Sequence, residues 1–86
     1  REVRTAMNPN TMNHIISATQ HARNKHPKFA DHICHALCLV QEEMGEVAKA
    51  INDQADWDEV VSEVYDTIAV LVRIAEKDFK RGPNEK

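Results

Sequence analysis

Two long stretches of the sequence repeat their apolar residues with the spacing of an α-helix, and this repeat limits the fold more than any other feature. In residues 31–52 the stripe consists of Ile33, Leu37, Val40, Met44, Val47, Ala48 and Ile51. In residues 56–81 it consists of Trp57, Val60, Val61, Val64, Ile68, Leu71, Val72, Ala75 and Phe79. Because residues three and four apart share one face of a helix, both stretches are predicted to be amphipathic helices.

The rest of the sequence predicts a third, shorter helix and no sheet. Residues 11–25 are weakly apolar at the same spacing, with Asn10 as the expected N-cap. Pro27 ends this helix, because a proline disfavours helical conformation in the residue before it. Asp31 is the expected N-cap of the second helix, and Gly82 ends the third near residue 81. The predicted fold class is therefore all-α.

The connection of about residues 53–55 is short, so the two long helices should form an antiparallel hairpin. Residues 10–81 are expected to form one domain between an N-terminal arm, residues 1–9, and a C-terminal tail, residues 82–86. Val70 and Ile74 widen the apolar arc of the third helix beyond what one partner helix covers. We expect a bundle-like homodimer or homotetramer, with docking of the first helix there as the alternative.

The composition weighs against a nucleic-acid-binding protein and against a membrane protein. The net charge of −3 weighs against a nucleic-acid-binding protein, which would carry a basic patch. No apolar run has a transmembrane length and no signal peptide is apparent, so a cytoplasmic protein without a membrane partner is expected. Cys34 and Cys38 are expected to be reduced. With His35 they offer too few ligands on one helix for a zinc site.

Four carboxylates interrupt the apolar stripes in the middle of the long helices. Glu43 and Glu46 lie one turn apart on the second helix, and Glu63 and Asp66 repeat this spacing on the third. In an antiparallel hairpin the two pairs can face each other, where they repel unless a cation lies between them. Ligand sets made only of oxygen suit Mg²⁺ or Mn²⁺. A solvated charged surface is the alternative that spacing alone leaves open.

The segment "EEMGE", followed after residues 47–62 by "EVYD", resembles the EExxE…ExxD pattern of MazG-like nucleoside triphosphate pyrophosphohydrolases. The context "HPKF…HALCLVQEEMGEVAKAI" is also similar, and the resemblance covers residues 26–75. It implies an all-α enzyme that hydrolyses NTPs or dNTPs to the monophosphate and pyrophosphate and so cleans nucleotide pools. It also implies that Glu43, Glu46, Glu63 and Asp66 bind Mg²⁺. Glu42 and Glu43 are the predicted catalytic residues, with Glu42 in a supporting or water-activating role.

Five further residues are candidates for binding the substrate. Lys49 and Arg73 could contact phosphates, with a solvated surface cation as the alternative for each. His26, Phe29 and Trp57 could contact a nucleobase, with a place in the core as the alternative for Phe29 and Trp57. The family usually carries further basic residues on a later helix, so the phosphate contacts here could move to residues 80–86 or to a neighbouring subunit.

Two other functions stay open on the sequence alone. The chain could be a non-catalytic helical dimerisation module that keeps the acidic residues as a surface. It could also be a dUTPase-type relative of the pyrophosphohydrolases.

Overall fold

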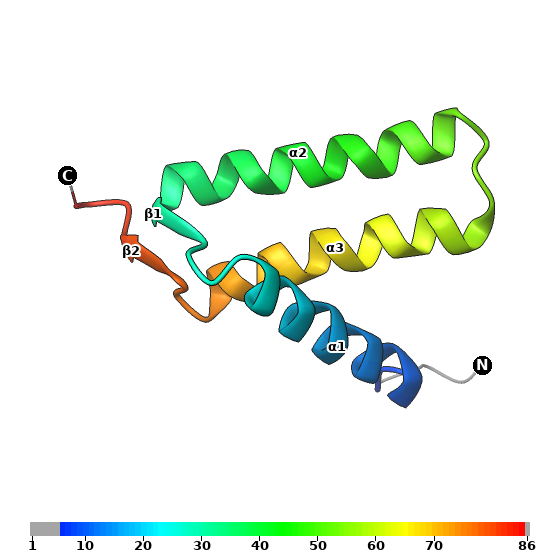
Figure 1. The fold of residues 1–86 in the computed structure, drawn as a ribbon, viewed down its shortest axis with the longest axis horizontal. Coiled ribbons are helices and arrows are strands. Elements are labelled where there is room, and N and C mark those ends of the chain that lie inside the picture. The colour runs from blue at the N-terminus through cyan, green and yellow to red at the C-terminus, as the bar shows by residue number, and fades with distance from the viewer. Residues whose placement is uncertain (1–5, 86) are drawn as a thin grey trace.

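The computed structural model describes residues 6–85 and consists mainly of three helices (Figure 1). The elements in order are α1 (Pro9–Lys25), β1 (Ala30–His32), α2 (Ile33–Asn52), α3 (Trp57–Ala75) and β2 (Phe79–Arg81). The predicted all-α architecture is confirmed, apart from the two short strands. Of the predicted N-terminal arm, residues 1–5 lie outside the described residues. No helix within residues 6–85 is long and apolar enough to cross a membrane.

Helices α2 and α3 form the predicted antiparallel hairpin (Figure 1). The turn between them contains Gln54 at a φ of 57°, and the amide of Ala55 donates to the carbonyl oxygen of Ala50 at 3.0 Å. Asp56 then caps α3 by accepting a hydrogen bond from the amide of Glu59 at 2.9 Å. This short, capped turn fixes which residues of α2 lie opposite which residues of α3.

The two predicted N-caps, Asn10 and Asp31, are wrong by two residues and one residue. Helix α1 is capped by Asn8, whose side chain accepts from the amide of Asn10, because Pro9 is already suited to the first helical position. Helix α2 is capped by His32, whose Nδ1 accepts from the amide of Cys34 at 3.0 Å. The predicted cap Asp31 instead pairs with Arg81 of β2. Helix α1 therefore begins at Pro9, before the predicted start at residue 11 and inside the predicted arm of residues 1–9, whereas α2 begins at Ile33, close to its predicted start.

Helix α3 ends at Ala75, so the prediction that it continues to about residue 81 is wrong. Lys77 adopts a φ of 58°, in the left-handed region that commonly ends helices. The chain then turns and β2 pairs in parallel with β1, with Ala30 opposite Phe79. These strands, three residues each, join the segment before α2 to the segment after α3.

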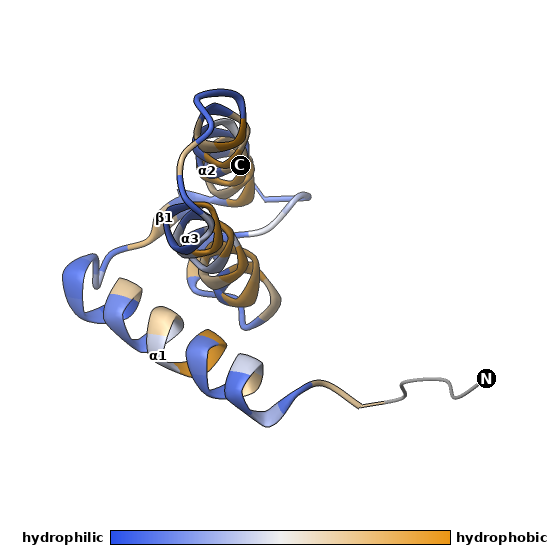
Figure 2. Cartoon of the chain, turned by 90° about the vertical axis from the view of Figure 1, so that its right-hand side faces the viewer, coloured by the Kyte–Doolittle hydropathy of each residue, from blue (hydrophilic) through white to orange (hydrophobic). Residues whose placement is uncertain are grey.

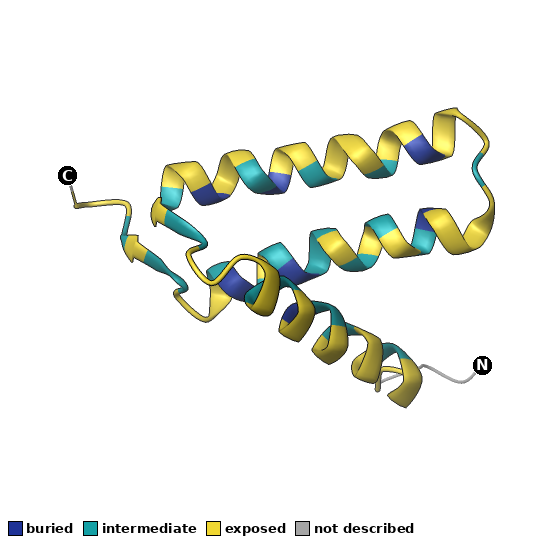
Figure 3. Ribbon diagram, viewed as in Figure 1, coloured by how far each residue is buried: buried dark blue, intermediate teal, exposed yellow. Residues whose placement is uncertain are grey.

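Helix α1 packs on α3 and makes few contacts with α2 (Figures 1 and 3). Docking of the first helix on the third, the alternative left open by the sequence, is therefore observed. Val70 and Ile74 are half-buried, and Thr19 of α1 is buried. The large apolar residues of α3 that remain exposed are Trp57, Val64 and Leu71.

Four charged side chains, Arg23, Arg73, Glu76 and Asp78, lock α1 to the end of α3, and we call them the junction network. The Arg73 side chain is only 4% exposed and donates from Nε to Asp78 Oδ2 at 2.9 Å. Arg23 Nε donates to the same oxygen at 3.0 Å and its guanidinium also pairs with Glu76. Arg73 also donates to the carbonyl oxygen of Ala22 at 3.2 Å. Every charge of this network thus has an opposite charge beside it.

The hairpin buries small residues and exposes large ones. Its buried apolar residues are Ala36, Val40, Ala50, Val60 and Ala69. Six large apolar side chains, which we call the apolar face, are exposed: Leu37, Met44 and Ile51 on α2, and Trp57, Val64 and Leu71 on α3. Residues seven apart lie two turns apart on the same side of a helix. Figure 2 accordingly shows hydrophobic colouring along one side of both helices.

Candidate metal centre

Three carboxylates converge between the middle of α2 and the middle of α3. Glu43 comes from α2, and Glu63 and Asp66 come from α3. Each offers an oxygen, and these three oxygens all lie within 4.8 Å of one another. Within residues 6–85 no lysine, arginine or histidine forms an ion pair with any of the three. We call these residues the acidic cluster.

Glu46, the fourth predicted ligand, lies outside this cluster. It is exposed, one helical turn closer to the hairpin turn, and it lines a separate pocket of about 250 Å³ together with Glu63 and Lys49. Its charge still acts on the cluster, since it contributes to the raised pKa of both Glu43 and Glu63. The structure therefore brings together three of the four predicted carboxylates and leaves Glu46 beside them.

Burial and mutual repulsion raise the pKa values of two members of the cluster. For Glu43 burial is the largest cause, followed by the charges of Asp66 and Glu63. For Glu63 burial is again the largest cause, followed by the charge of Asp66. Both effects disfavour the ionised carboxylate. A cation between the oxygens would act in the opposite direction, because it favours the ionised form.

A pocket of about 400 Å³ opens beside the acidic cluster, between the three helices. Helices α2 and α3 contribute its acidic lining residues, Glu42, Glu43 and Asp66, whereas the end of α1 and the link after it contribute Lys25 and Lys28. Its remaining lining residues are Ala18, His21, Ala22, His26, Phe29, His35, Leu39, Ala69, Val70 and Arg73. A volume of this size falls within the usual range for small-molecule sites.

The five residues predicted to bind substrate are divided between different places. His26, Phe29 and Arg73 line this pocket. The Arg73 guanidinium is held by Asp78 and lies 4.6 Å from the centre of the Phe29 ring. Lys49 lines the smaller pocket and pairs with Asp53 at 2.9 Å.

Trp57 is 75% exposed at the start of α3 and lines neither of these two pockets. The alternative that Trp57 belongs to the core of the chain is therefore wrong. Its predicted contact with a nucleobase stays a prediction, as do the roles of the other four residues.

No zinc ligand set is formed by the residues considered for it. Cys34 and Cys38 are exposed on α2, and His35 faces the large pocket. Among residues 6–85 the acidic cluster is the one group of three or more side chains arranged to share a metal ion. Its donors are all carboxylate oxygens, which fit Mg²⁺ or Mn²⁺ rather than zinc.

Sequence reasoning missed three pocket residues that precede the acidic motif, namely His21, Lys25 and Lys28, and considered His35 only for zinc. The signal available was a concentration of basic and imidazole side chains in "HARNKHPKFADHICH". We interpreted that segment as a helix end with His26 and Phe29 as candidate nucleobase contacts, because the position of its lysines beside the acids depends on how α1 docks. In comparisons with known proteins, no family model, curated protein or solved structure matches the chain.

Proposed function

We propose that the protein is a Mg²⁺-dependent pyrophosphohydrolase that converts nucleoside or deoxynucleoside triphosphates to the monophosphate and pyrophosphate. The observation that carries this proposal is the convergence of Glu43, Glu63 and Asp66 within 4.8 Å beside a pocket of about 400 Å³. The similarity of the motif to MazG-like enzymes supplies the reaction type. In this proposal the enzyme removes unwanted nucleotides from the cytoplasmic pool.

Glu43, Glu63 and Asp66 would hold Mg²⁺, and Mn²⁺ fits the same donors. When bound, the metal would neutralise phosphate charge and lower the pKa of a water molecule. Glu42 lines the pocket next to Glu43, and in this proposal its carboxylate would accept a proton from the attacking water. Attack at the α-phosphorus follows from the similarity to the family. Glu46 contributes charge from the edge of the cluster.

The test is an assay of pyrophosphate release from a panel of NTPs and dNTPs, with and without Mg²⁺. We expect pyrophosphate and the nucleoside monophosphate as products, and no turnover after the metal is chelated. Release of orthophosphate, or turnover that does not depend on a divalent cation, would contradict the proposal. The panel also tests a dUTPase-type specificity, which would appear as a strong preference for dUTP.

We also propose that the apolar face binds a second copy of the chain to form a four-helix-bundle-like dimer, with a tetramer as the larger form. The six exposed side chains recur every seven residues on each helix of the hairpin, and the apolar faces of two copies could pack together. Burying one side chain of this size stabilises by about 1.5 kcal/mol or more. Replacing Met44 with Lys in both copies should weaken the dimer about a hundredfold.

Sedimentation velocity measures this directly. A wild-type protein that stays monomeric at micromolar concentration would refute the dimer. The apolar face also favours a second candidate function, a helical dimerisation module without catalysis. A stable dimer that releases no pyrophosphate from any nucleotide would favour that module over the enzyme.

A further inference from the structure

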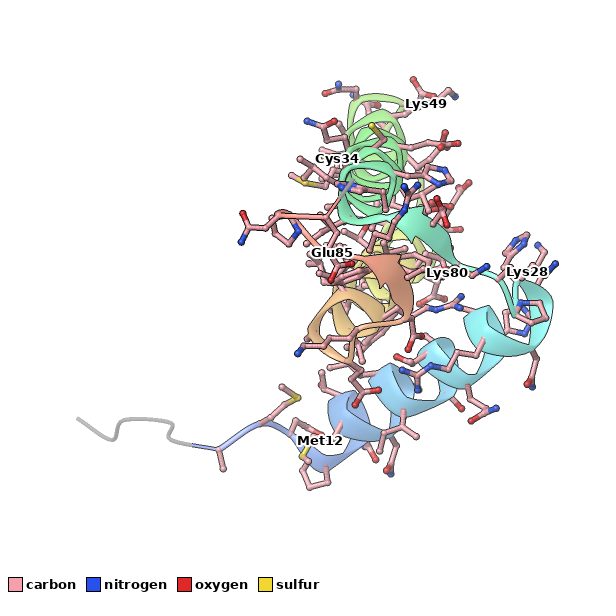
Figure 4. The ribbon with its side chains drawn as sticks, turned by 90° about the vertical axis from the view of Figure 1, so that its left-hand side faces the viewer. Met12, Lys28, Cys34, Lys49, Lys80 and Glu85 are labelled. Carbon is pink, nitrogen blue, oxygen red and sulfur yellow. The ribbon has the colours of Figure 1, made fainter. Side chains whose placement is uncertain are left out.

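The segment that precedes the acidic motif in the sequence contributes two lysines, Lys25 and Lys28, to the lining of the large pocket. We call this part of the lining the basic wall. Lys25 is the last residue of α1, and Lys28 lies in the link between α1 and β1. Figure 4 shows Lys28 at this link, on the side of the molecule where α1 ends. Both lysines line the same pocket as Glu43 and Asp66 of the acidic cluster. The pocket is therefore lined by acidic residues from α2 and α3 and by basic residues from the end of α1 and the link after it.

The two lysines differ from the arginines near this pocket because their ammonium groups form no ion pair among residues 6–85. Arg73 and Arg23 are both paired with Asp78. Lys25 and Lys28 form no ion pair with any carboxylate of residues 6–85. Their charge is thus available to an anionic ligand.

The junction network holds the basic wall in position. Arg73 donates to the carbonyl oxygen of Ala22, in the last turn of α1 three residues before Lys25. The same guanidinium lies over the ring of Phe29, the residue after Lys28. Pairing of β1 with β2 fixes the chain immediately after that. The backbone that carries both lysines is therefore fixed relative to α3, which carries Asp66.

We propose that Lys25 and Lys28 bind the terminal phosphates of a triphosphate whose metal-bound part lies at the acidic cluster. The inference rests on the proposed function for the identity of the substrate as a triphosphate. A triphosphate is repelled by the carboxylates except where a cation lies between them. Its terminal phosphates, away from the metal, therefore need positively charged side chains beside them. The two lysines supply that charge from the segment before the acidic motif. His26 and His35 add imidazole groups to the same pocket.

The probe is inorganic tripolyphosphate with Mg²⁺, which tests phosphate binding without a nucleobase and without turnover. Calorimetric titration of the full chain should detect binding. A hydrogen bond to a charged group contributes about 1.5 kcal/mol, so Lys25→Gln and Lys28→Gln should each weaken binding about tenfold. Lys28→Arg should keep most of the affinity. In the nucleotide assay the same Gln variants should raise KM more than they lower kcat.

Lys77→Gln is the matched control, since Lys77 is an exposed lysine after α3 that does not line the pocket. Wild-type affinity for Mg²⁺-tripolyphosphate in both pocket variants, or equal losses in Lys77→Gln, would overturn the inference. Nucleotide turnover with an unchanged KM in these variants would overturn it while leaving the proposed function intact. Lysine-dependent binding of tripolyphosphate without hydrolysis of any nucleotide would refute the function and support the phosphate site.

Discussion

The acidic cluster and the junction network both place charged side chains between packed helices, yet they satisfy those charges in opposite ways. In the junction network, Asp78 accepts hydrogen bonds from Arg23 and Arg73. In the acidic cluster, Glu43, Glu63 and Asp66 face one another with no cationic side chain paired to them among the described residues. The charges of the junction are balanced within one chain, whereas the carboxylates of the cluster have no cationic partner among residues 6–85.

The pKa values differ in the same sense. Burial alone would raise the pKa of Asp78, but hydrogen bonds from Arg23 and Arg73 outweigh burial and lower it. Burial raises the pKa of Glu43, and neighbouring carboxylates raise it further. Ionisation therefore stabilises the fold at the junction and destabilises it at the cluster. Charge that costs stability in the free protein is expected where function requires it.

The largest expected effect separates the two regions by activity. Glu43→Gln, Glu63→Gln and Asp66→Asn each remove one charge of the cluster while keeping the shape of the side chain. Because a bound metal supplies several kcal/mol of charge stabilisation, we expect turnover to fall about a thousandfold. The measurement is steady-state pyrophosphate release, with circular dichroism to check that the helices persist. Glu76→Gln, an exposed carboxylate of the junction, should keep nearly the parent rate, and equal losses in both regions would contradict the comparison.

The second effect concerns the stability of the metal-free protein, for which the junction network should matter more than the acidic cluster. Asp78→Asn leaves the guanidinium of Arg73, a residue only 3% exposed, without its negative partner. Removing one partner of a buried pair costs about 3 kcal/mol or more, and we expect about that value since Asp78 is itself 22% exposed. Urea unfolding measures the loss. Glu63→Gln combined with Asp66→Asn should lose nothing in the same experiment, and a loss as large as that of Asp78→Asn would show that the cluster stabilises the fold.

Metal binding should stabilise the protein through the cluster alone. At a Mg²⁺ concentration one hundred times Kd, mass action contributes about 2.7 kcal/mol to the free energy of unfolding. The Glu63→Gln/Asp66→Asn variant should gain nothing from the metal, because two of three ligands lose their charge. Asp78→Asn starts lower but should keep the full gain. Thermal melts with and without Mg²⁺ check both expectations, and an undiminished gain in the double variant would place the metal elsewhere.

The smallest effect is the dependence of metal-free stability on pH. The raised pKa values of Glu43 and Glu63 contribute stability that is fully present below the ordinary value of 4.5 and is lost as pH rises through the raised values. The lowered pKa of Asp78 contributes stability that is present above 3.8 and is lost as pH falls through the lowered value. The free energy of unfolding, measured in urea across a range of pH, should fall both toward acid pH, the acid limb, and above the ordinary pKa of glutamate.

Two variants show which residues cause each part of the dependence of stability on pH. Glu43→Gln/Glu63→Gln should flatten the decline above 4.5 and leave the acid limb in place. Asp78→Asn should flatten the acid limb instead. The same flattening in both variants would mean that the two regions titrate as one.

The helices and their hairpin could be predicted because both depend on local sequence. Apolar spacing locates α2 and α3, and a short connection leaves them no alternative to antiparallel packing. The predicted end of α3 was wrong because the apolar stripe continues to Phe79. In the structure the chain leaves the helix after Ala75, where Asp78 pairs with Arg73 and Phe79–Arg81 pairs with β1. Strands of three residues, paired with a distant segment, leave no periodic signal in the sequence.

The candidate site was predictable to the extent that it lies on the hairpin. Glu43, Glu63 and Asp66 converge as the spacing indicates, whereas Glu46 lines the smaller pocket, because spacing along each helix does not fix the register between the two helices. The basic wall was not predictable, since Lys28 reaches the pocket only through the docking of α1 on α3. A wide apolar stripe also does not reveal which of its residues face the partner helix.

The junction network also has a consequence for the order of folding. Arg23 and Asp78 are 55 residues apart in the sequence, and Arg73 and Ala22 are 51 apart. The hairpin, by contrast, closes through a turn of a few residues, and short loops close faster and at a smaller entropic cost than long ones. We expect α2 and α3 to pair first and α1 to dock last. On a ribosome, α1 would have to wait until Asp78 has been synthesised, so the pocket would be the last part of the molecule to take shape.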